Sequence, residues 1–177
     1  AFLDPFTMSE TVARICAAIE ARRPLQHVVI NVAKLVTMSH DPELRASVNG
    51  CDIINADGKG VVWGARFLGL NVPERVAGID LMLNLLGEAE RRGFRPFLLG
   101  AREEVLNEAV RRLQLQFPDL ELAGHHHGYF WDDEEAMVEH IAASGADLLF
   151  VAISSPKKEN FLNRHGVQMG VPFTMGV

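Results

Sequence analysis

The residues with the clearest capacity for chemistry are Asp57 and its neighbours. The segment Asn55-Ala56-Asp57-Gly58-Lys59-Gly60 follows a short apolar run that predicts a buried strand. A carboxylate at the end of such a strand can accept a proton from an attacking hydroxyl, or can hold a ribose or a metal ion. Asp-Gly after a strand is also ordinary turn chemistry. Residue type alone therefore leaves a functional and a structural interpretation of Asp57 open.

Three further turns contain residues suited to anions. Arg75 lies in the loop Glu74–Gly78, and a guanidinium group suits a diphosphate, although a surface Glu–Arg pair is the alternative interpretation. Gly100 and Ala101 join a predicted strand to a predicted helix, whose first N–H groups can hold an anion. Lys158 lies at another predicted helix start, where an anionic ligand would offset its mismatch with the helix dipole.

The loop Gly124–Trp131 contains three consecutive histidines, His125–His127, and an aromatic side chain between glycine turns. Three adjacent histidines cannot all point at one metal ion, and no second ligand cluster accompanies them, so we expect no metal site. Tyr129 is more informative, because an aromatic ring beside Gly124 and Gly128 can stack on a nucleobase or a sugar.

The elements that must position these turns alternate between short apolar runs and amphipathic helical patterns. The first helix opens with the capping box Thr7-Met8-Ser9-Glu10 and ends before Pro24. Strands are predicted at 26–31, 51–55, 95–99, 120–123, 147–152 and 171–175. Further helices are predicted at 32–39, from Asp41-Pro42 onward, at 59–69 with Val61, Val62, Ala65 and Leu68 facing inward, at 80–92, at 102–116, from Asp132 to Ser144, and at 157–168.

This alternation predicts an α/β fold: a Rossmann-like, mostly parallel open sheet of about six strands with helices on both faces. In such sheets ligands bind outside the carboxyl ends of the strands. The polar and glycine-rich turns described above all follow predicted strands or lie in the loops beside them. We therefore expect them to gather at one edge of the sheet.

Composition narrows the function classes. The chain has 177 residues, 48% of them hydrophobic, which suits a single domain with a sizeable core. A formal net charge of −6 argues against a duplex nucleic-acid binder. The sequence shows no signal peptide or membrane-spanning stretch, so we expect a cytosolic location. The end at Val171–Val177, a strand running into a glycine turn, suggests that a C-terminal extension is missing.

Taken in order, the motifs resemble the WecG/TagA/CpsF glycosyltransferases. The resemblance lies in Asn31, the Ala-Asp-Gly at 56–58, the Glu-Arg-Val-Ala-Gly at 74–78, the Phe-Leu-Leu-Gly at 97–100, the Gly-Tyr-Phe at 128–130 and the Ser-Pro-Lys-Lys-Glu at 155–159. Each motif is weak alone, but six in the same order are specific. The resemblance runs from about Asn31 to Val177.

The resemblance implies an inverting transfer of a sugar from a UDP-sugar to a polyprenyl-diphosphate-linked saccharide, with no metal or other cofactor. It implies that Asp57 is the catalytic base, that Asn31 is an active-site residue and that Arg75 assists the leaving diphosphate. Gly100, Ala101, Gly124, Gly128, Tyr129, Pro156, Lys158 and Glu159 correspond to its nucleotide-side turns. It also implies peripheral binding to the inner face of the cytoplasmic membrane through the missing C-terminal region, and a homo-oligomer.

Two residues depart from the family pattern. Val29 stands where the family often has Thr, and Lys158 stands where it often has Gln. Both departures argue against assuming an N-acetylmannosamine donor. Two other functions stay open from the residues alone: a non-catalytic nucleotide-binding protein, and a nicotinamide-dependent oxidoreductase on the same fold. The oxidoreductase lacks support because the G-x-G-x-x-G fingerprint is absent.

Overall fold

The computed structural model describes residues 3–177, which form one sheet of six parallel strands and eight α-helices. The strands are β1 (Leu25–Ile30), β2 (Ile53–Ala56), β3 (Pro96–Gly100), β4 (Gly124–His126), β5 (Leu148–Ala152) and β6 (Phe173–Gly176). The helices are α1 (Met8–Glu20), α2 (Val32–His40), α3 (Pro42–Asn49), α4 (Lys59–Phe67), α5 (Gly78–Arg92), α6 (Glu103–Gln116), α7 (Glu134–Ser144) and α8 (Lys157–Met169). The predicted α/β fold class is confirmed.

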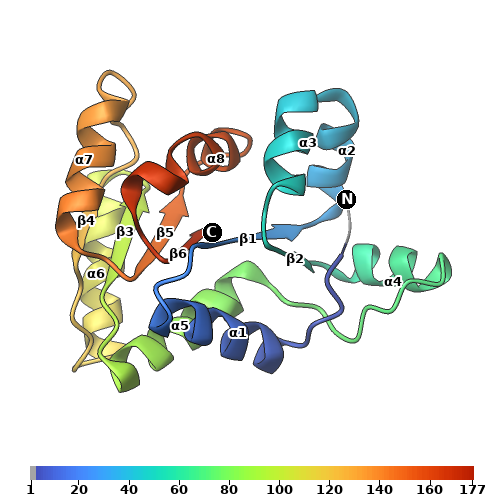
Figure 1. The fold of residues 1–177 in the computed structure, drawn as a ribbon, viewed down its shortest axis with the longest axis horizontal. Helices are drawn as coiled ribbons and strands as arrows, with labels where there is room; N and C mark the ends of the chain where they lie inside the picture. Colours follow the sequence, from blue (N-terminus) through green and yellow to red (C-terminus); the bar gives the residue numbers. More distant parts are fainter. Residues whose placement is uncertain (1–2) are drawn as a thin grey trace.

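The sheet has the strand order β2-β1-β6-β5-β3-β4 and is covered on both faces. Helices α1, α5 and α6 cover one face, and α2, α3, α7 and α8 cover the other (Figure 1). The strands are buried on both sides, which explains their nearly continuous apolar sequences. Four phenylalanines, Phe97, Phe150, Phe161 and Phe173, are among the largest fully buried side chains.

Local sequence signals set the helix boundaries. The Thr7–Glu10 capping box forms at the start of α1, and the Asp41 side chain caps α3, with Pro42 at its first position. Helices α5, α7 and α8 each end at a glycine in the left-handed conformation: Gly93, Gly145 and Gly170. These caps begin or end the helices at defined residues, so that the connections to the sheet stay short.

The connections create two crevices at the carboxyl edge of the sheet. After β1 the chain turns to α2 and α3 on one face, whereas after β2 it runs to α5 on the other. The same divergence occurs between β5, which leads to α8, and β3, which leads to α6. Neighbouring strands whose connections leave toward opposite faces open a crevice between them, the usual ligand site of such sheets.

Two sequence predictions were wrong. Residues 120–123 do not form the fourth strand; β4 covers Gly124–His126 instead. Leu120 is buried in the core beneath α5 and α6, and pairing with β3 begins only where the Ala123 amide donates to Pro96. Leu68, predicted to face inward, is 75% exposed because α4 ends at Phe67.

A buried polar network lies under β1 and β2. His27 is 1% exposed, and its Nε2 lies 3.0 Å from Oδ1 of Asn55, which also accepts a 3.3 Å hydrogen bond from the Thr11 hydroxyl. Burial lowers the pKa of His27 from 6.5 to about 4, with the Asn55 contact opposing this shift and the charge of Lys34 adding to it. The folded protein therefore contains neutral His27.

This burial predicts a loss of stability in acid. Between pH 6.5 and about 4 the unfolded chain binds a proton at His27 that the folded protein does not, so stability falls as the pH falls through this window. We expect His27 to account for about 2–3 kcal/mol of the loss between pH 7 and pH 4.5. Urea unfolding at both pH values should show a smaller loss for His27→Gln than for His40→Gln, a matched exposed control. Equal losses in the two variants would contradict this account.

Candidate functional site

The first crevice, between the ends of β1, β2 and β6, forms a cleft of about 380 Å³ that we call the Asp57 cleft. Its walls are α2, the start of α5 and the loop before α8. Its floor includes Val29 and Gly176, near the ends of two strands. The polar side chains that line it are Asn31, Lys34, Thr37, Asp57, Ser155 and Lys158.

Backbone contacts fix the position of Asp57. Its amide donates a 2.8 Å hydrogen bond to the Ile30 carbonyl at the end of β1, and Gly58, with φ of +99°, turns the chain into α4. Arg75 Nη1 lies 3.5 Å from Asp57 Oδ1, and Arg75 Nη2 lies 3.1 Å from Asp80 Oδ2. Arg75 thus bridges two carboxylates at the rim of the cleft, with its own side chain 46% exposed.

Asn31 lies opposite Asp57 because it caps α2. Its side-chain oxygen accepts a 2.8 Å hydrogen bond from the Lys34 amide. This cap fixes the side chain at the point where β1 meets the cleft. The hydrogen bond that caps α2 therefore also holds the Asn31 side chain at the cleft.

A buried ion pair holds the two helical walls of the cleft together. Lys34 on α2 and Glu159 on α8 approach to 2.7 Å, with side chains only 8% and 4% exposed. The Lys34 ammonium also donates a 3.0 Å hydrogen bond to the Val29 carbonyl. Glu159 was predicted to contact the nucleotide, but the structure buries it against Lys34 instead.

Lys158, beside this pair, points toward the end of β6. Its ammonium donates a 2.8 Å hydrogen bond to the Val177 carbonyl, and its aliphatic chain lies against Gly176, where a Cβ atom would approach it to 2.8 Å. Burial lowers the pKa of Lys158, partly opposed by the charge of Glu159. Its amine is therefore held at the carboxyl edge of the sheet.

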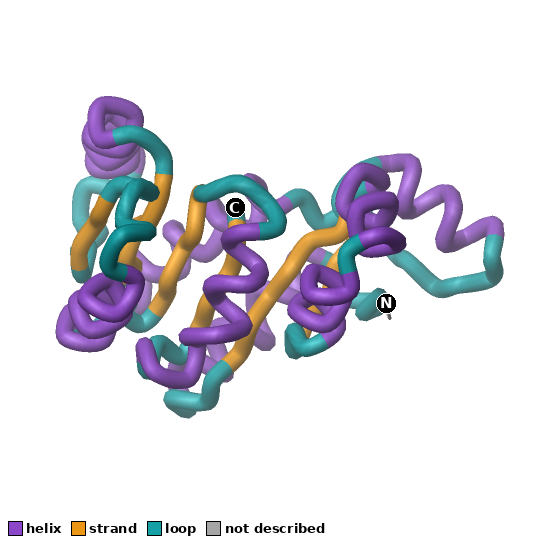
Figure 2. Tube along the Cα trace, turned by 90° about the horizontal axis from the view of Figure 1, so that it is seen from above, coloured by secondary structure: helices purple, strands orange, loops and turns teal. Residues whose placement is uncertain are grey.

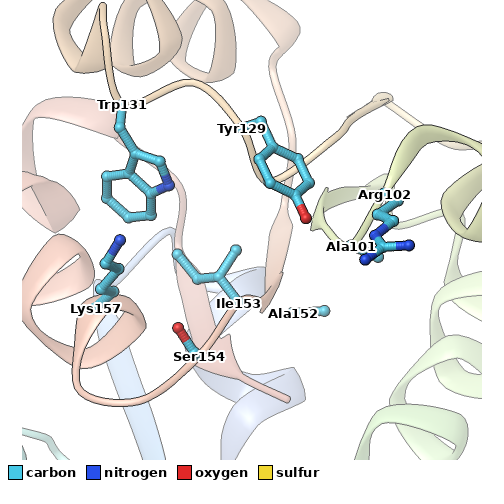
Figure 3. A pocket seen from close by; sticks show the side chains of 9 residues that line it. Ala101, Arg102, Tyr129, Trp131, Ala152, Ile153, Ser154 and Lys157 are labelled. Atoms are coloured by element: carbon cyan, nitrogen blue, oxygen red, sulfur yellow. The ribbon is translucent and has the colours of Figure 1, made fainter.

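The second crevice, between β5 and β3, forms a cleft of about 350 Å³ that we call the Tyr129 cleft. Figure 3 shows Trp131 and Lys157 on one side of it and Arg102 on the other, with Tyr129 between them. The Lys157 ammonium lies 4.8 Å from the centre of the Trp131 ring, a cation–π distance. Two aromatic rings and two cations suit a ligand that combines a flat ring with phosphate.

Glycines allow the backbone segments around the Tyr129 cleft to approach closely. Gly100 has φ of +139°, and a Cβ atom there would overlap the backbone of Ala152. A Cβ atom at Gly128 would lie 2.7 Å from the Ile153 side chain. The Gly128 amide donates to the Ala101 carbonyl at 2.9 Å, which links the Tyr129 loop to the turn after β3.

The two clefts share the loop that joins β5 to α8. Ser154 lines the Tyr129 cleft and Ser155 lines the Asp57 cleft. In the same way, Lys157 lines the Tyr129 cleft and its neighbour Lys158 lines the Asp57 cleft. One ligand with two parts can therefore occupy both clefts, with the junction between them beside two lysines.

The structure divides the predicted site residues into four groups. Asp57, Asn31 and Lys158 line the Asp57 cleft, and Arg75 reaches it through its ion pair. Ala101, Gly128 and Tyr129 line the other cleft, and Gly100 shapes it from below. Pro156 lies in the shared loop, preceded by a cis peptide bond. Gly124 and Glu159 serve packing, since a Cβ atom at Gly124 would lie 2.7 Å from the Phe97 ring.

The sequence prediction left six residues of the Tyr129 cleft out of the site, of which Arg102, Trp131 and Lys157 carry a charge or an aromatic ring. Each of these three lies next to a residue that was predicted or in a loop that was singled out. A signal was present, because aromatic and basic residues directly after strands at a ligand edge are candidates for stacking and phosphate contacts. Which of two neighbouring lysines faces which cleft could not be read from their spacing.

The three consecutive histidines, His125–His127, lie at the end of β4 and just after it. Among residues 3–177 no group of three or more His, Cys, Asp or Glu side chains is arranged to hold a metal ion. His126 Nδ1 lies 2.8 Å from the His127 carbonyl, and the His126 and His127 rings lie 4.2 Å apart. The side chains of His126 and His127 thus contact each other and the adjacent backbone.

Comparison with known proteins gives a family match over almost the whole chain. The sequence model of the Glycosyl transferase WecG/TagA/CpsF family matches residues 2–177. The N-acetylglucosaminyldiphosphoundecaprenol N-acetyl-beta-D-mannosaminyltransferase of Bacillus spizizenii is 36% identical over 125 residues, which cover 71% of this chain and 48% of that protein. The chain thus spans about half the length of this curated relative.

The buried pair predicts an asymmetric response to mutation. Lys34→Met leaves the Glu159 charge buried without a partner, and we expect a loss of about 3–5 kcal/mol in the free energy of unfolding. The double variant Lys34→Met/Glu159→Leu removes both charges and should recover most of that loss. Urea unfolding measures both, with Arg111→Met, from an exposed pair on α6, as a control expected to lose less than about 1 kcal/mol. Additive losses in the double variant would contradict the pairing.

Proposed function

The chain belongs to the WecG/TagA/CpsF family of glycosyltransferases, and from this premise we propose that it transfers a sugar from a UDP-sugar to a polyprenyl-diphosphate-linked saccharide, with inversion. The name of the Bacillus spizizenii relative gives an acceptor of this class, an N-acetylglucosamine on undecaprenyl diphosphate. Products of this kind serve the assembly of cell-surface polysaccharides.

One observation carries the proposal: the two clefts meet at the connection from β5 to α8, where Ser154 and Lys157 line one cleft and Ser155 and Lys158 line the other. The Tyr129 cleft, with its aromatic rings and cations, suits uridine. The Asp57 cleft, with its carboxylate, suits the sugar and the acceptor hydroxyl. A UDP-sugar that spans both would place its diphosphate beside the two lysines and the first amides of α8, where negative charge is stabilised.

Asp57 is then the general base. Its carboxylate takes the proton from the acceptor hydroxyl while the oxygen of that hydroxyl attacks the anomeric carbon of the donor. The bond from that carbon to the UDP oxygen breaks on the opposite side, and UDP leaves with the electron pair. Arg75 and the lysines stabilise the negative charge that grows on the departing diphosphate. The proposal assigns this role to protein cations rather than to a bound metal.

Two residues of the Asp57 cleft bear on the choice of donor sugar. Val29 lines the cleft and lies within 3.4 Å of a Cβ position on Gly78, so this part of the floor is apolar. Lys158 contributes an ammonium group to the same cleft. We propose that these two residues select a donor other than a UDP-N-acetylmannosamine, and a panel of UDP-sugars would identify it.

The site also suggests where the protein acts. None of the helices within residues 3–177 has the length and hydrophobicity needed to cross a bilayer. A lipid-linked acceptor, however, lies at a membrane surface. We propose that the protein binds peripherally at the inner face of the cytoplasmic membrane, where nucleotide sugars are present.

Asp57→Asn tests the base directly. We expect turnover to fall by about 10²–10⁴-fold, because the amide cannot accept the proton, while affinity for UDP stays within about twofold. The measurements are sugar transfer to a lipid-linked acceptor and calorimetric titration with UDP. Asp119→Asn, an exposed carboxylate far along the chain, is the matched control and should keep full turnover. Normal turnover in Asp57→Asn would exclude this role.

Arg75→Ala tests the leaving-group side. Because Arg75 pairs with Asp57 and we assign its guanidinium to the diphosphate, we expect both weaker UDP binding and slower turnover, each by at least about tenfold. Arg111→Ala removes an arginine of similar exposure from α6 and should change neither quantity. Unchanged affinity and rate in Arg75→Ala would remove this residue from the site.

A further inference from the structure

The exposed surface of α2 and α4 is unusually apolar. On α2, Val32, Leu35 and Val36 are 54%, 40% and 58% exposed, and on α4, Trp63 and Phe67 are 70% and 91% exposed. We call these five residues the α2–α4 shelf. Single exposed apolar residues are ordinary, but a group on two neighbouring helices marks a contact surface.

The two helices present the shelf as one surface. A Cβ atom at Gly60 would lie 3.1 Å from the Val32 side chain, so Gly60 marks the side of α4 that meets α2. Trp63 and Phe67 follow Gly60 at helical spacings of three and seven residues, and therefore lie on that same side. Gly64, between them, has no neighbour within 4 Å and leaves the surface open.

Packing among residues 3–177 does not account for the apolar side chains on this side of α4. The opposite side already buries Val61, Val62 and Ala65 against Ala56 and Val72. A surface helix of a soluble protein normally carries polar residues opposite its buried face. Helix α4 is instead apolar on both sides, and it extends beyond the edge of the sheet in both views (Figures 1 and 2).

The shelf begins at the candidate active site. Asp57 precedes α4 by one glycine, and its amide is bound to the carbonyl of Ile30, two residues before Val32. Ala33 and Thr37 of α2 line the Asp57 cleft, and the exposed apolar residues of α2 that belong to the shelf lie on the same helix. A lipid-linked acceptor bound at Asp57 could therefore extend along the protein surface to the shelf.

Charge indicates which partner covers it. Helices α2 and α4 contain no Asp or Glu, and α4 has the exposed basic residues Lys59 and Arg66, although the chain has a formal net charge of −6. A second copy would bring the same basic residues together. An anionic lipid surface instead offers headgroups to the Lys59 ammonium, since the Arg66 guanidinium already donates to the Val72 and Pro73 carbonyls, and it offers hydrocarbon to the aromatic rings, the pattern of interfacial helices.

We propose that the α2–α4 shelf inserts into the boundary between headgroups and acyl chains of an anionic lipid bilayer. The proposal rests on the proposed function, because the lipid-linked acceptor gives the site a reason to face a membrane. In this orientation the bilayer lies next to Asp57, where the sugar of a lipid-linked diphosphate emerges. The shelf thus orients the site as well as anchoring the protein.

Vesicle co-sedimentation without nucleotide tests the contact. Vesicles contain phosphatidylglycerol and phosphatidylcholine, or phosphatidylcholine alone. We expect Trp63→Ser/Phe67→Ser to partition at least about tenfold less than the parent onto the anionic vesicles, since binding scales with the apolar area buried. The matched control is Leu115→Ser/Val167→Ser, which removes side chains 72% and 90% exposed on α6 and α8 and should bind like the parent.

Fluorescence gives a second readout. The chain has two tryptophans, so Trp131→Phe leaves Trp63 as the sole tryptophan, which can be excited selectively over tyrosine. Its emission should shift to the blue on addition of anionic vesicles, because insertion removes the indole from water. An unchanged spectrum together with equal sedimentation of the parent and the Trp63→Ser/Phe67→Ser variant would overturn the proposal.

Two further outcomes separate this proposal from its alternatives. In one outcome the parent protein does not bind vesicles but forms a dimer in analytical ultracentrifugation, and Trp63→Ser/Phe67→Ser is a monomer. This outcome would show that a second copy covers the shelf and would overturn the lipid contact. Transfer to a water-soluble short-chain acceptor tests the proposed function separately. Shelf-dependent vesicle binding without any transfer would refute the function and leave the lipid contact standing.

Discussion

The buried ion pair between Lys34 and Glu159 is the constraint on which the site depends. It joins α2, which follows β1, to α8, which follows β5, across the end of β6. Burying two charges costs several kcal/mol, and the 2.7 Å contact with the added Val29 carbonyl offsets that cost only in this geometry. If the helices separated, the cleft walls that carry Asn31 and Lys158 would no longer face Asp57.

The same logic extends from the rim of the cleft into the core. Asp57 is placed by its amide bond to Ile30, and the strand that leads to it is tied to β1 and α1 by the His27–Asn55–Thr11 network. The Nδ1 of His27 has no hydrogen-bond partner among residues 3–177, so the buried ring depends on the Nε2 contact with Asn55, which a shifted register between β1 and β2 would break. The position of the Asp57 carboxylate therefore depends on polar contacts made by Asn55, two residues earlier in the chain.

The sequence predicted the alternation of strands and helices because caps, glycines and apolar periodicity are local signals. It also predicted the turns at Asn31 and Asp57, since residues that follow parallel strands must meet at one edge. It could not predict the partner of Glu159, because an acidic residue at a helix start serves equally well for a ligand or for a lysine on another helix. The strand predicted at 120–123 failed for a related reason: Leu120 is apolar because it fills the core under α5 and α6, not because it pairs.

Charge and hydrophobicity are concentrated at one end of the sheet, where the proposed function places both substrates. Cationic side chains gather where the strands end, with Arg102 and Lys157 in one cleft and Lys158 in the other, although the whole chain is acidic. An anionic donor is therefore attracted to the carboxyl edge while the remaining surface repels it. The apolar shelf adjoins that edge beside Asp57. Under the proposed function, a water-soluble donor and a lipid-linked acceptor would then approach the Asp57 carboxylate from different sides, which is the arrangement that a transfer between two phases requires.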